Sequence, residues 1–130
     1  MCYCQSSKSY QECCEPFHLG TASPESAEAL MRSRYSAFAI KNMDYLRKTQ
    51  DPQTREDFDR ETNLQWAESV EFLGLEILKT EQNGNKAIVE FRAQFKELAS
   101  GQESSHHELS QFRRQQGVWY FRSGKLIQNQ

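Results

Sequence analysis

The first fourteen residues contain all four cysteines of this 130-residue chain, and no other feature restricts its fold as strongly. One residue separates Cys2 from Cys4, eight separate Cys4 from Cys13, and Cys14 follows directly. A single turn of the segment between them can therefore bring the four sulfur atoms to one point. Zn²⁺ takes four thiolates in a closed tetrahedral shell, and in so short a segment the binding energy of the metal is also folding energy. The spacing predicts a metal site, with zinc as the favoured ion.

Three other interpretations of the cysteines have to be compared with zinc. Disulfides need an oxidising compartment, but the chain opens on polar residues without the charged and then apolar pattern of a secretory signal. We therefore expect a reduced, cytoplasmic setting. An iron–sulfur cluster also takes four thiolates, although the ferredoxin spacings differ from these. Free, inert thiols are the simplest alternative, and the clustering of every cysteine in the chain argues against them.

The sequence Ser-Lys-Ser-Tyr precedes the second cysteine pair, and together with the cysteine spacing it resembles the SEC-C motif. That motif is the zinc-binding tail also found in the SecA translocation ATPase. The resemblance implies Zn²⁺ held by Cys2, Cys4, Cys13 and Cys14. His18 lies close enough in the chain to be a spare ligand, and a histidine in a loop or an interface is the other interpretation.

The composition limits what the rest of the chain can be. The chain is long enough for one ordinary domain with a buried core beside the small cysteine segment. Its 16 basic and 18 acidic residues give a net charge of −2, so there is no global electrostatic reason to expect a nucleic-acid partner. No apolar run approaches the roughly 20 residues that span a bilayer, and we expect no membrane segment.

The first half of the chain after the cysteines has a helical period. Residues 15–20 are expected to be an irregular linker, after which Ser23 and Pro24 supply an N-cap and a first helical residue. Apolar residues recur at helical spacing from Ala27 to Phe38, and the pattern breaks at Asn42. A short helix is expected over 43–46, and a third, strongly charged one over about 54–69.

The second half alternates between apolar and polar residues, as strands do. A first strand after Val70 is expected to place Leu73, Leu75 and Ile77 on one face, and the Asn83–Gly84 pair is a hairpin signal. The return strand over 87–96 alternates most regularly, and two more strands are expected over 106–115 and 118–122. Helices followed by an antiparallel meander predict an α+β fold.

Several segments spread over the chain resemble the YchJ family of small bacterial proteins. They are Leu30 to Phe38, Asp44-Tyr45-Leu46, Val89-Glu90-Phe91, His107 to Phe112 and Gly117 to Tyr120. The resemblance implies a SEC-C knuckle over residues 1–20 and, over 21–130, a domain similar to nuclear transport factor two and ketosteroid isomerase. In that α+β fold, N-terminal helices pack on a curved antiparallel sheet that forms a cone around a pocket. No set of catalytic residues comes with it.

Arg34 is a charge that the helical period places on the apolar face, beside Leu30 and Phe38. A buried charge without a partner costs several kcal/mol, so Arg34 needs a carboxylate or a route to water. If Phe112 faces inward, strand alternation also turns Ser110, Glu108 and His106 inward. Glu108 is then the expected partner of Arg34, and two other carboxylates compete with it, those of Glu90 and Asp44.

This polar group has three interpretations. The favoured one is a buried ion pair that fixes the helix against the sheet. The second is a ligand pocket in which Arg34 binds a small anion, while Tyr35, Ser110 and either His106 or His107 supply hydrogen bonds. The third is acid–base catalysis, which needs a carboxylate free of an arginine partner in an apolar pocket.

Two classes of function follow. The favoured one is a non-enzymatic cytoplasmic module whose zinc knuckle docks on a protein or a ribosome-associated partner, by analogy with SEC-C tails. The alternative is a small-molecule-binding or enzymatic cone with a polar pocket around Arg34 and Glu108. Because the segment through Gly20 is polar, the knuckle and the cone are also expected to unfold separately.

Overall fold

The computed structural model describes residues 1–127. Two short 3₁₀-helices (η), four α-helices and four strands are formed by these residues, in this order: η1 (Tyr10–Glu12), α1 (Glu15–Leu19), α2 (Ala27–Ala39), α3 (Met43–Lys48), η2 (Arg55–Asp57), α4 (Arg60–Ser69), β1 (Val70–Asn83), β2 (Lys86–Glu97), β3 (Glu103–Gln115) and β4 (Val118–Leu126). None of the helices in this part of the chain is long and apolar enough to cross a membrane.

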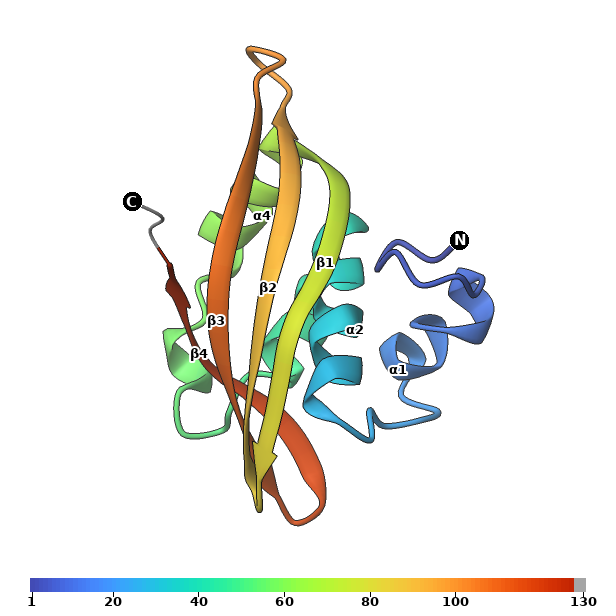
Figure 1. The fold of residues 1–130 in the computed structure, drawn as a ribbon, viewed down its shortest axis with the longest axis vertical. Helices are drawn as coiled ribbons and strands as arrows, with labels where there is room; N and C mark the ends of the chain where they lie inside the picture. Colours follow the sequence, from blue (N-terminus) through green and yellow to red (C-terminus); the bar gives the residue numbers. More distant parts are fainter. Residues whose placement is uncertain (128–130) are drawn as a thin grey trace.

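The strands form one antiparallel sheet in the order β1-β2-β3-β4. Helices α2 and α4 lie behind this curved sheet in the view of Figure 1, and the N-terminal segment lies beside α2 on the side away from β3 and β4. The helices come first in the chain and the meander follows. This arrangement confirms the predicted α+β fold.

Strand β2 is the centre of the core, as its alternation predicts. Val89, Phe91 and Phe95 are buried on the face toward the helices, where they pack with Leu30 of α2 and Phe112 of β3. A second cluster lies around α3 and α4. Its buried members are Ala37, Met43, Tyr45, Leu46 and Ala67. Trp66 and Phe72 contact both clusters, so the two form one continuous core.

Strand β1 differs from its predicted pattern at one position. The register shifts between Phe72 and Gly74, so Phe72, and not Leu73, joins Leu75 and Ile77 against the core. The shift is a β-bulge, in which one extra residue of the bulged strand moves the following side chains to the other face. Alternation alone therefore assigned Leu73 to the wrong face.

Three helix boundaries also differ from the prediction. Helix α2 is capped by Ser26, whose side chain accepts a hydrogen bond from the Ala29 amide, and not by Ser23. The segment 54–69 forms two helices, because η2 ends at its C-cap Phe58 and Asp59 then caps α4. The segment expected to be an irregular linker is helix α1, which ends on Gly20 in a left-handed conformation at φ 80°.

Candidate metal centre and central cavity

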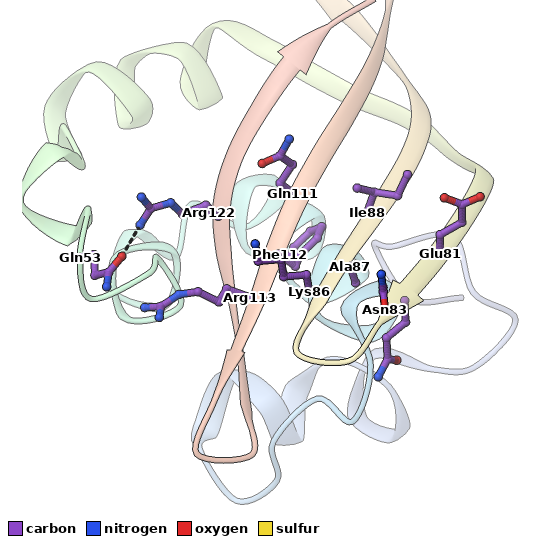
Figure 2. A pocket seen from close by; sticks show the side chains of 11 residues that line it. Gln53, Glu81, Asn83, Lys86, Ala87, Ile88, Gln111, Phe112, Arg113 and Arg122 are labelled. Atoms are coloured by element: carbon purple, nitrogen blue, oxygen red, sulfur yellow. Dashed lines mark hydrogen bonds between the residues drawn. The ribbon is translucent and has the colours of Figure 1, made fainter.

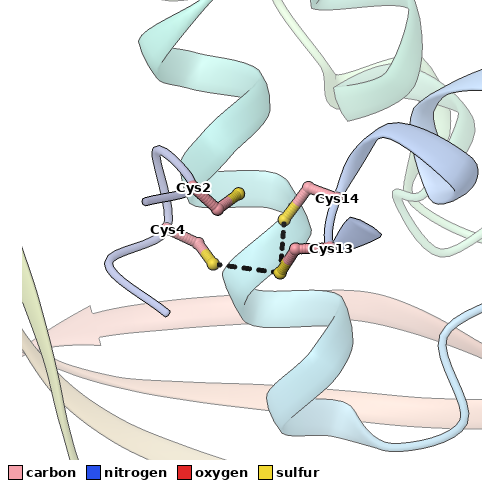
Figure 3. A group of neighbouring side chains, drawn as sticks. All are labelled: Cys2, Cys4, Cys13 and Cys14. Carbon is pink, nitrogen blue, oxygen red and sulfur yellow. Dashed lines mark hydrogen bonds between the residues drawn. The ribbon is translucent and has the colours of Figure 1, made fainter. Parts of the chain in front are cut away.

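The four cysteine sulfur atoms all lie within 4.8 Å of one another. Cys2 and Cys4 come from the N-terminal stretch, while Cys13 follows η1 and Cys14 is the N-cap residue of α1 (Figure 3). The turn between the pairs is closed by a hydrogen bond from the Cys2 amide to the Lys8 carbonyl oxygen. We use the name knuckle for residues 1–20, which contain this cluster.

The spacing of the sulfur atoms fits a tetrahedral metal ion. The Sγ atoms of Cys4 and Cys13 are 3.6 Å apart, and those of Cys13 and Cys14 are 3.8 Å apart. Four sulfur ligands at the usual zinc–sulfur distance of about 2.3 Å are about 3.8 Å from one another in a tetrahedron. All four residues are free cysteines in the structure. The donor set and its dimensions therefore suit a four-thiolate metal site.

The protonation of the thiols supports the same conclusion. Hydrogen bonding to the Cys14 thiol lowers the pKa of Cys4 to about 4, against the opposing effect of burial. The same interaction raises the pKa of Cys14, and burial raises the pKa of Cys13. Metal ligation requires thiolates, and a bound cation stabilises them. A bound metal ion would therefore stabilise the thiolate form of these cysteines.

The knuckle packs on one face of helix α2. Arg32 donates to the Cys4 carbonyl oxygen over 3.0 Å, and the Cys2 Sγ atom lies 3.8 Å from the Ser36 hydroxyl oxygen. His18 Nε2 lies 2.8 Å from the Ser33 carbonyl oxygen. Because a carbonyl only accepts, Nε2 carries the proton, and Nδ1 accepts from the Tyr10 hydroxyl over 2.8 Å.

These contacts decide the role of His18. Both of its ring nitrogens already have partners, and burial lowers the pKa of the imidazole. Of the two interpretations, His18 is therefore the interface histidine. Among the described residues, the group of potential metal ligands consists of the four cysteines and does not include His18.

The other face of α2 lines a cavity of about 540 Å³ between the helices and the sheet. Five of the six residues predicted to form a pocket lie in its wall: Arg34, Tyr35, His106, Glu108 and Ser110. The sixth, His107, points to the opposite face of the sheet, where its Nε2 atom is 2.6 Å from the Glu90 carboxylate. Strand alternation separates His107 from its two neighbours.

The predicted ion pair between Arg34 and Glu108 does not form. Arg34 Nη1 instead donates to the Leu46 carbonyl oxygen over 2.8 Å and to the Thr49 hydroxyl over 2.6 Å. Glu108 accepts from the Ser110 hydroxyl over 2.9 Å. The last carbonyls of α3 have no partner within the helix and carry its negative dipole end, so they attract the guanidinium.

The two competing carboxylates are also engaged elsewhere. Glu90 pairs with His107, and Asp44 pairs with Arg60 on the surface. The guanidinium carbon of Arg34 lies 4.4 Å from the centre of the Phe121 ring, which covers one face of the charge. Burial is the main reason that the pKa of Arg34 falls to about 10. The side chain therefore stays charged at neutral pH.

A second charged group, centred on Asp51, was not predicted from the sequence. The Asp51 side chain is fully buried and receives two hydrogen bonds from Arg113, at 2.7 and 2.6 Å, and a longer one from Arg122. Hydrogen bonding from Arg113 lowers the pKa of Asp51 to about 2. Figure 2 shows Arg113 and Arg122 in the surface groove beside β2 and β3, with Arg122 bonded to Gln53. The Asp51-Pro52 pair indicates only a helix end, and no local signal reveals these partners.

Comparisons with known proteins agree with this architecture. The family model described as YchJ, middle NTF2-like domain, matches residues 26–124. A UPF0225 protein from Geobacter sulfurreducens is 41% identical over 133 residues, which cover 100% of this chain and 81% of that protein. The solution structure of a SEC-C motif containing protein from Rhodopseudomonas palustris has a TM-score of 0.91 at 46% identity, covering 98% of both chains.

A crystal structure extends the comparison. A SEC-C motif containing protein from Psychrobacter arcticus has a TM-score of 0.83 at 31% identity, and the match covers 99% of this chain and 84% of that one. Both solved structures match over almost the whole chain.

Proposed function

The chain belongs to the YchJ family, and from this membership we propose that it is a zinc-binding interaction module whose knuckle docks a protein partner. The single observation that carries the proposal is the set of four cysteine sulfur atoms within 4.8 Å of one another. Structural zinc sites are closed in this way, with four protein ligands and no open position for a substrate. Such a site holds a surface in shape, which is what a docking module needs.

Zinc is the ion that suits these donors best. Thiolates select Cu(I), zinc and iron–sulfur clusters; a closed tetrahedral shell of four cysteines is a common structural zinc site, and the cysteine spacing is unlike the ferredoxin spacings. The Ser6 hydroxyl donates to the Cys13 sulfur over 3.1 Å, as hydrogen-bond donors around structural sites do. In this proposal residues 1–20 are the metal-dependent unit, and residues 21–130 are the domain that presents it.

The surface of the knuckle supports docking on a protein. Seven large hydrophobic side chains are exposed in the described part of the chain, and three of them belong to the first nineteen residues. Met1 is 82% exposed, Tyr3 49% and Leu19 70%. Three exposed apolar side chains in so short a segment give the knuckle apolar surface for a protein partner to bury. The net charge of −2 favours a protein surface over nucleic acid as the partner.

Site-specific photocrosslinking in living bacterial cells tests the proposal. The photoreactive residue benzoylphenylalanine replaces Tyr3 in one variant and Leu78 in a control, because Leu78 is an exposed apolar residue of β1 outside the knuckle. We expect a discrete adduct at position 3 that disappears when Cys13→Ser is added. Equal adducts at both positions, no adduct at position 3, or an adduct that survives Cys13→Ser would contradict knuckle docking.

A further inference from the structure

The cavity on the sheet side of α2 has the form of a small-molecule site. Its volume of about 540 Å³ lies within the usual range for ligand pockets, roughly 300–1,000 Å³. Much of the wall is aromatic. Trp66 packs edge-on against Phe72 and Phe95, with ring centres 5.5 and 5.1 Å apart, and Phe91 and Phe121 extend the same wall. The apolar part of a small ligand can therefore be enclosed in this cavity.

Arg34 brings a positive charge without an acidic partner into this cavity. The residue is only 6% exposed, and no carboxylate of the described residues lies within 4.0 Å of its guanidinium. Nη1 is used by Leu46 and Thr49, while Nε and Nη2 have no hydrogen-bond acceptor in that part of the chain. A buried charge is normally paired, and this one has free donors beside an open volume.

Glu108 places a carboxylate, which accepts hydrogen bonds, in the same cavity wall as the Arg34 guanidinium. Its carboxylate accepts one hydrogen bond, from Ser110, and an ionised carboxylate has about four acceptor positions. Gly124 leaves room for this group, because a Cβ atom at that position would lie 2.6 Å from Glu108 Oε2. The cavity thus has a cationic donor and an anionic acceptor on an aromatic wall, and these two side chains together carry no net charge.

We propose that this cavity binds a small amphipathic carboxylate. The acid group of the ligand takes the free N–H donors of Arg34, its aromatic or other apolar body lies against Trp66, and a hydroxyl or amine on it donates to Glu108. Guanidinium and carboxylate form two parallel, charge-assisted hydrogen bonds. A phosphate dianion fits less well, because one cation cannot balance it beside Glu108. This binding is separate from the docking function of the knuckle.

Isothermal titration calorimetry of the full chain tests the proposal with matched probes. Para-hydroxyphenylacetate is compared with its neutral amide, with phenylacetate and with inorganic phosphate. We expect one para-hydroxyphenylacetate per chain and at least tenfold weaker binding of the amide, because the neutral amide cannot form the charge-assisted pair with Arg34. Arg34→Met should weaken binding of the carboxylate at least tenfold. Arg92→Met, on the other face of the sheet, should leave the affinity unchanged.

Two further arms complete the experiment. Phenylacetate lacks the hydroxyl that we assign to Glu108, so it should bind more weakly than para-hydroxyphenylacetate, and Glu108→Leu should remove that difference. Arg34→Lys keeps the charge without the planar donors, and it decides the case if Arg34→Met does not fold. The proposal is overturned if neither carboxylate binds, if the amide or phosphate binds as tightly, or if Arg34→Lys binds the carboxylate as the wild type does.

Discussion

The imidazole of His18 joins the knuckle to the central helix, because its Nε2–H group donates to the Ser33 carbonyl oxygen over 2.8 Å. The same ring accepts from Tyr10 and lies against Tyr45, with ring centres 4.7 Å apart. Next to it, Phe17 packs against the apolar cluster around α3. These contacts favour joint unfolding of the knuckle and the cone, although the polar sequence before Gly20 predicts separate unfolding.

Removal of the metal should therefore lower the stability of the whole chain. We expect chelation or Cys13→Ser to lower the melting temperature of the cooperative transition by roughly 5–10 °C, which corresponds to about 2 kcal/mol for a domain of this size. Differential scanning calorimetry with and without chelator measures the shift. An unchanged transition, together with loss of structure in the first twenty residues alone, would support two independent units instead.

The hydrogen bonds of His18 should be measurable by substitution. His18→Phe keeps an aromatic ring beside Tyr45 and removes both hydrogen bonds, so we expect a loss of about 1–2 kcal/mol in the free energy of unfolding. Urea denaturation at pH 7.5 provides the measurement. Leu19→Ser is the matched control, because Leu19 is exposed and should change stability little.

His18 should also make stability depend on pH. Burial lowers its pKa in the folded state, so the unfolded state binds more protons in acid. The stability that the neutral ring contributes is fully present above the unfolded pKa of about 6.5 and is lost as the pH falls below that value. The difference in stability between wild type and His18→Phe should shrink over that range. A difference independent of pH would show that His18 is not held neutral.

The regular parts of the fold could be read from the sequence. The alternation of β2 places Ala87, Val89, Phe91, Ala93 and Phe95 on one face, and all five are buried. The Asn83–Gly84 hairpin signal and the short helix after Asn42 are also confirmed. These features depend on local backbone preferences and on periodicity, which a sequence displays directly.

The partners of the buried charges could not be read in the same way. Arg34 bonds to a backbone carbonyl and a hydroxyl, whereas charge matching considers only carboxylates. Asp51 lies 62 residues from Arg113 in the chain, and only the packing of its loop on the sheet brings the two together. Likewise, the cysteine spacing predicts a cluster and does not reveal that it packs on α2.

A double-mutant cycle should find little coupling between Arg34 and Glu108. Arg34→Met removes a buried charge and leaves the Leu46 carbonyl still bonded to Thr49, so we expect a change of about 1 kcal/mol or less in either direction. The effects of Arg34→Met and Glu108→Leu on the free energy of unfolding should be additive to within about 0.5 kcal/mol. Urea denaturation of the four proteins gives the coupling. A coupling energy of about 2 kcal/mol or more would show that Arg34 and Glu108 form the ion pair predicted from the sequence.

Asp51 should matter more than any surface carboxylate. Asp51→Asn removes the buried negative charge that Arg113 and Arg122 share and replaces one acceptor oxygen with a donor NH2 group, so we expect a loss of about 2–3 kcal/mol at pH 7. Because the pKa of Asp51 is lowered to about 2, its contribution is complete above about pH 4 and is lost as the pH falls through 2. In urea denaturation over this pH range, the free energies of unfolding of the wild type and Asp51→Asn should converge.

The control for this prediction is Asp44→Asn. Asp44 forms its ion pair with Arg60 at the surface, where its side chain is 85% exposed, so the change should be below about 1 kcal/mol. Equal effects of the two substitutions would mean that the Asp51 group contributes no more than an exposed pair.

Native mass spectrometry of the purified chain, kept away from chelators, tests the metal centre most directly. We predict one Zn²⁺ per chain, held by Cys2, Cys4, Cys13 and Cys14, and lost in Cys13→Ser. Acidification should also release it, because each ligand must be a thiolate. A well-folded chain that contains no stoichiometric zinc and titrates as four free thiols would contradict the account.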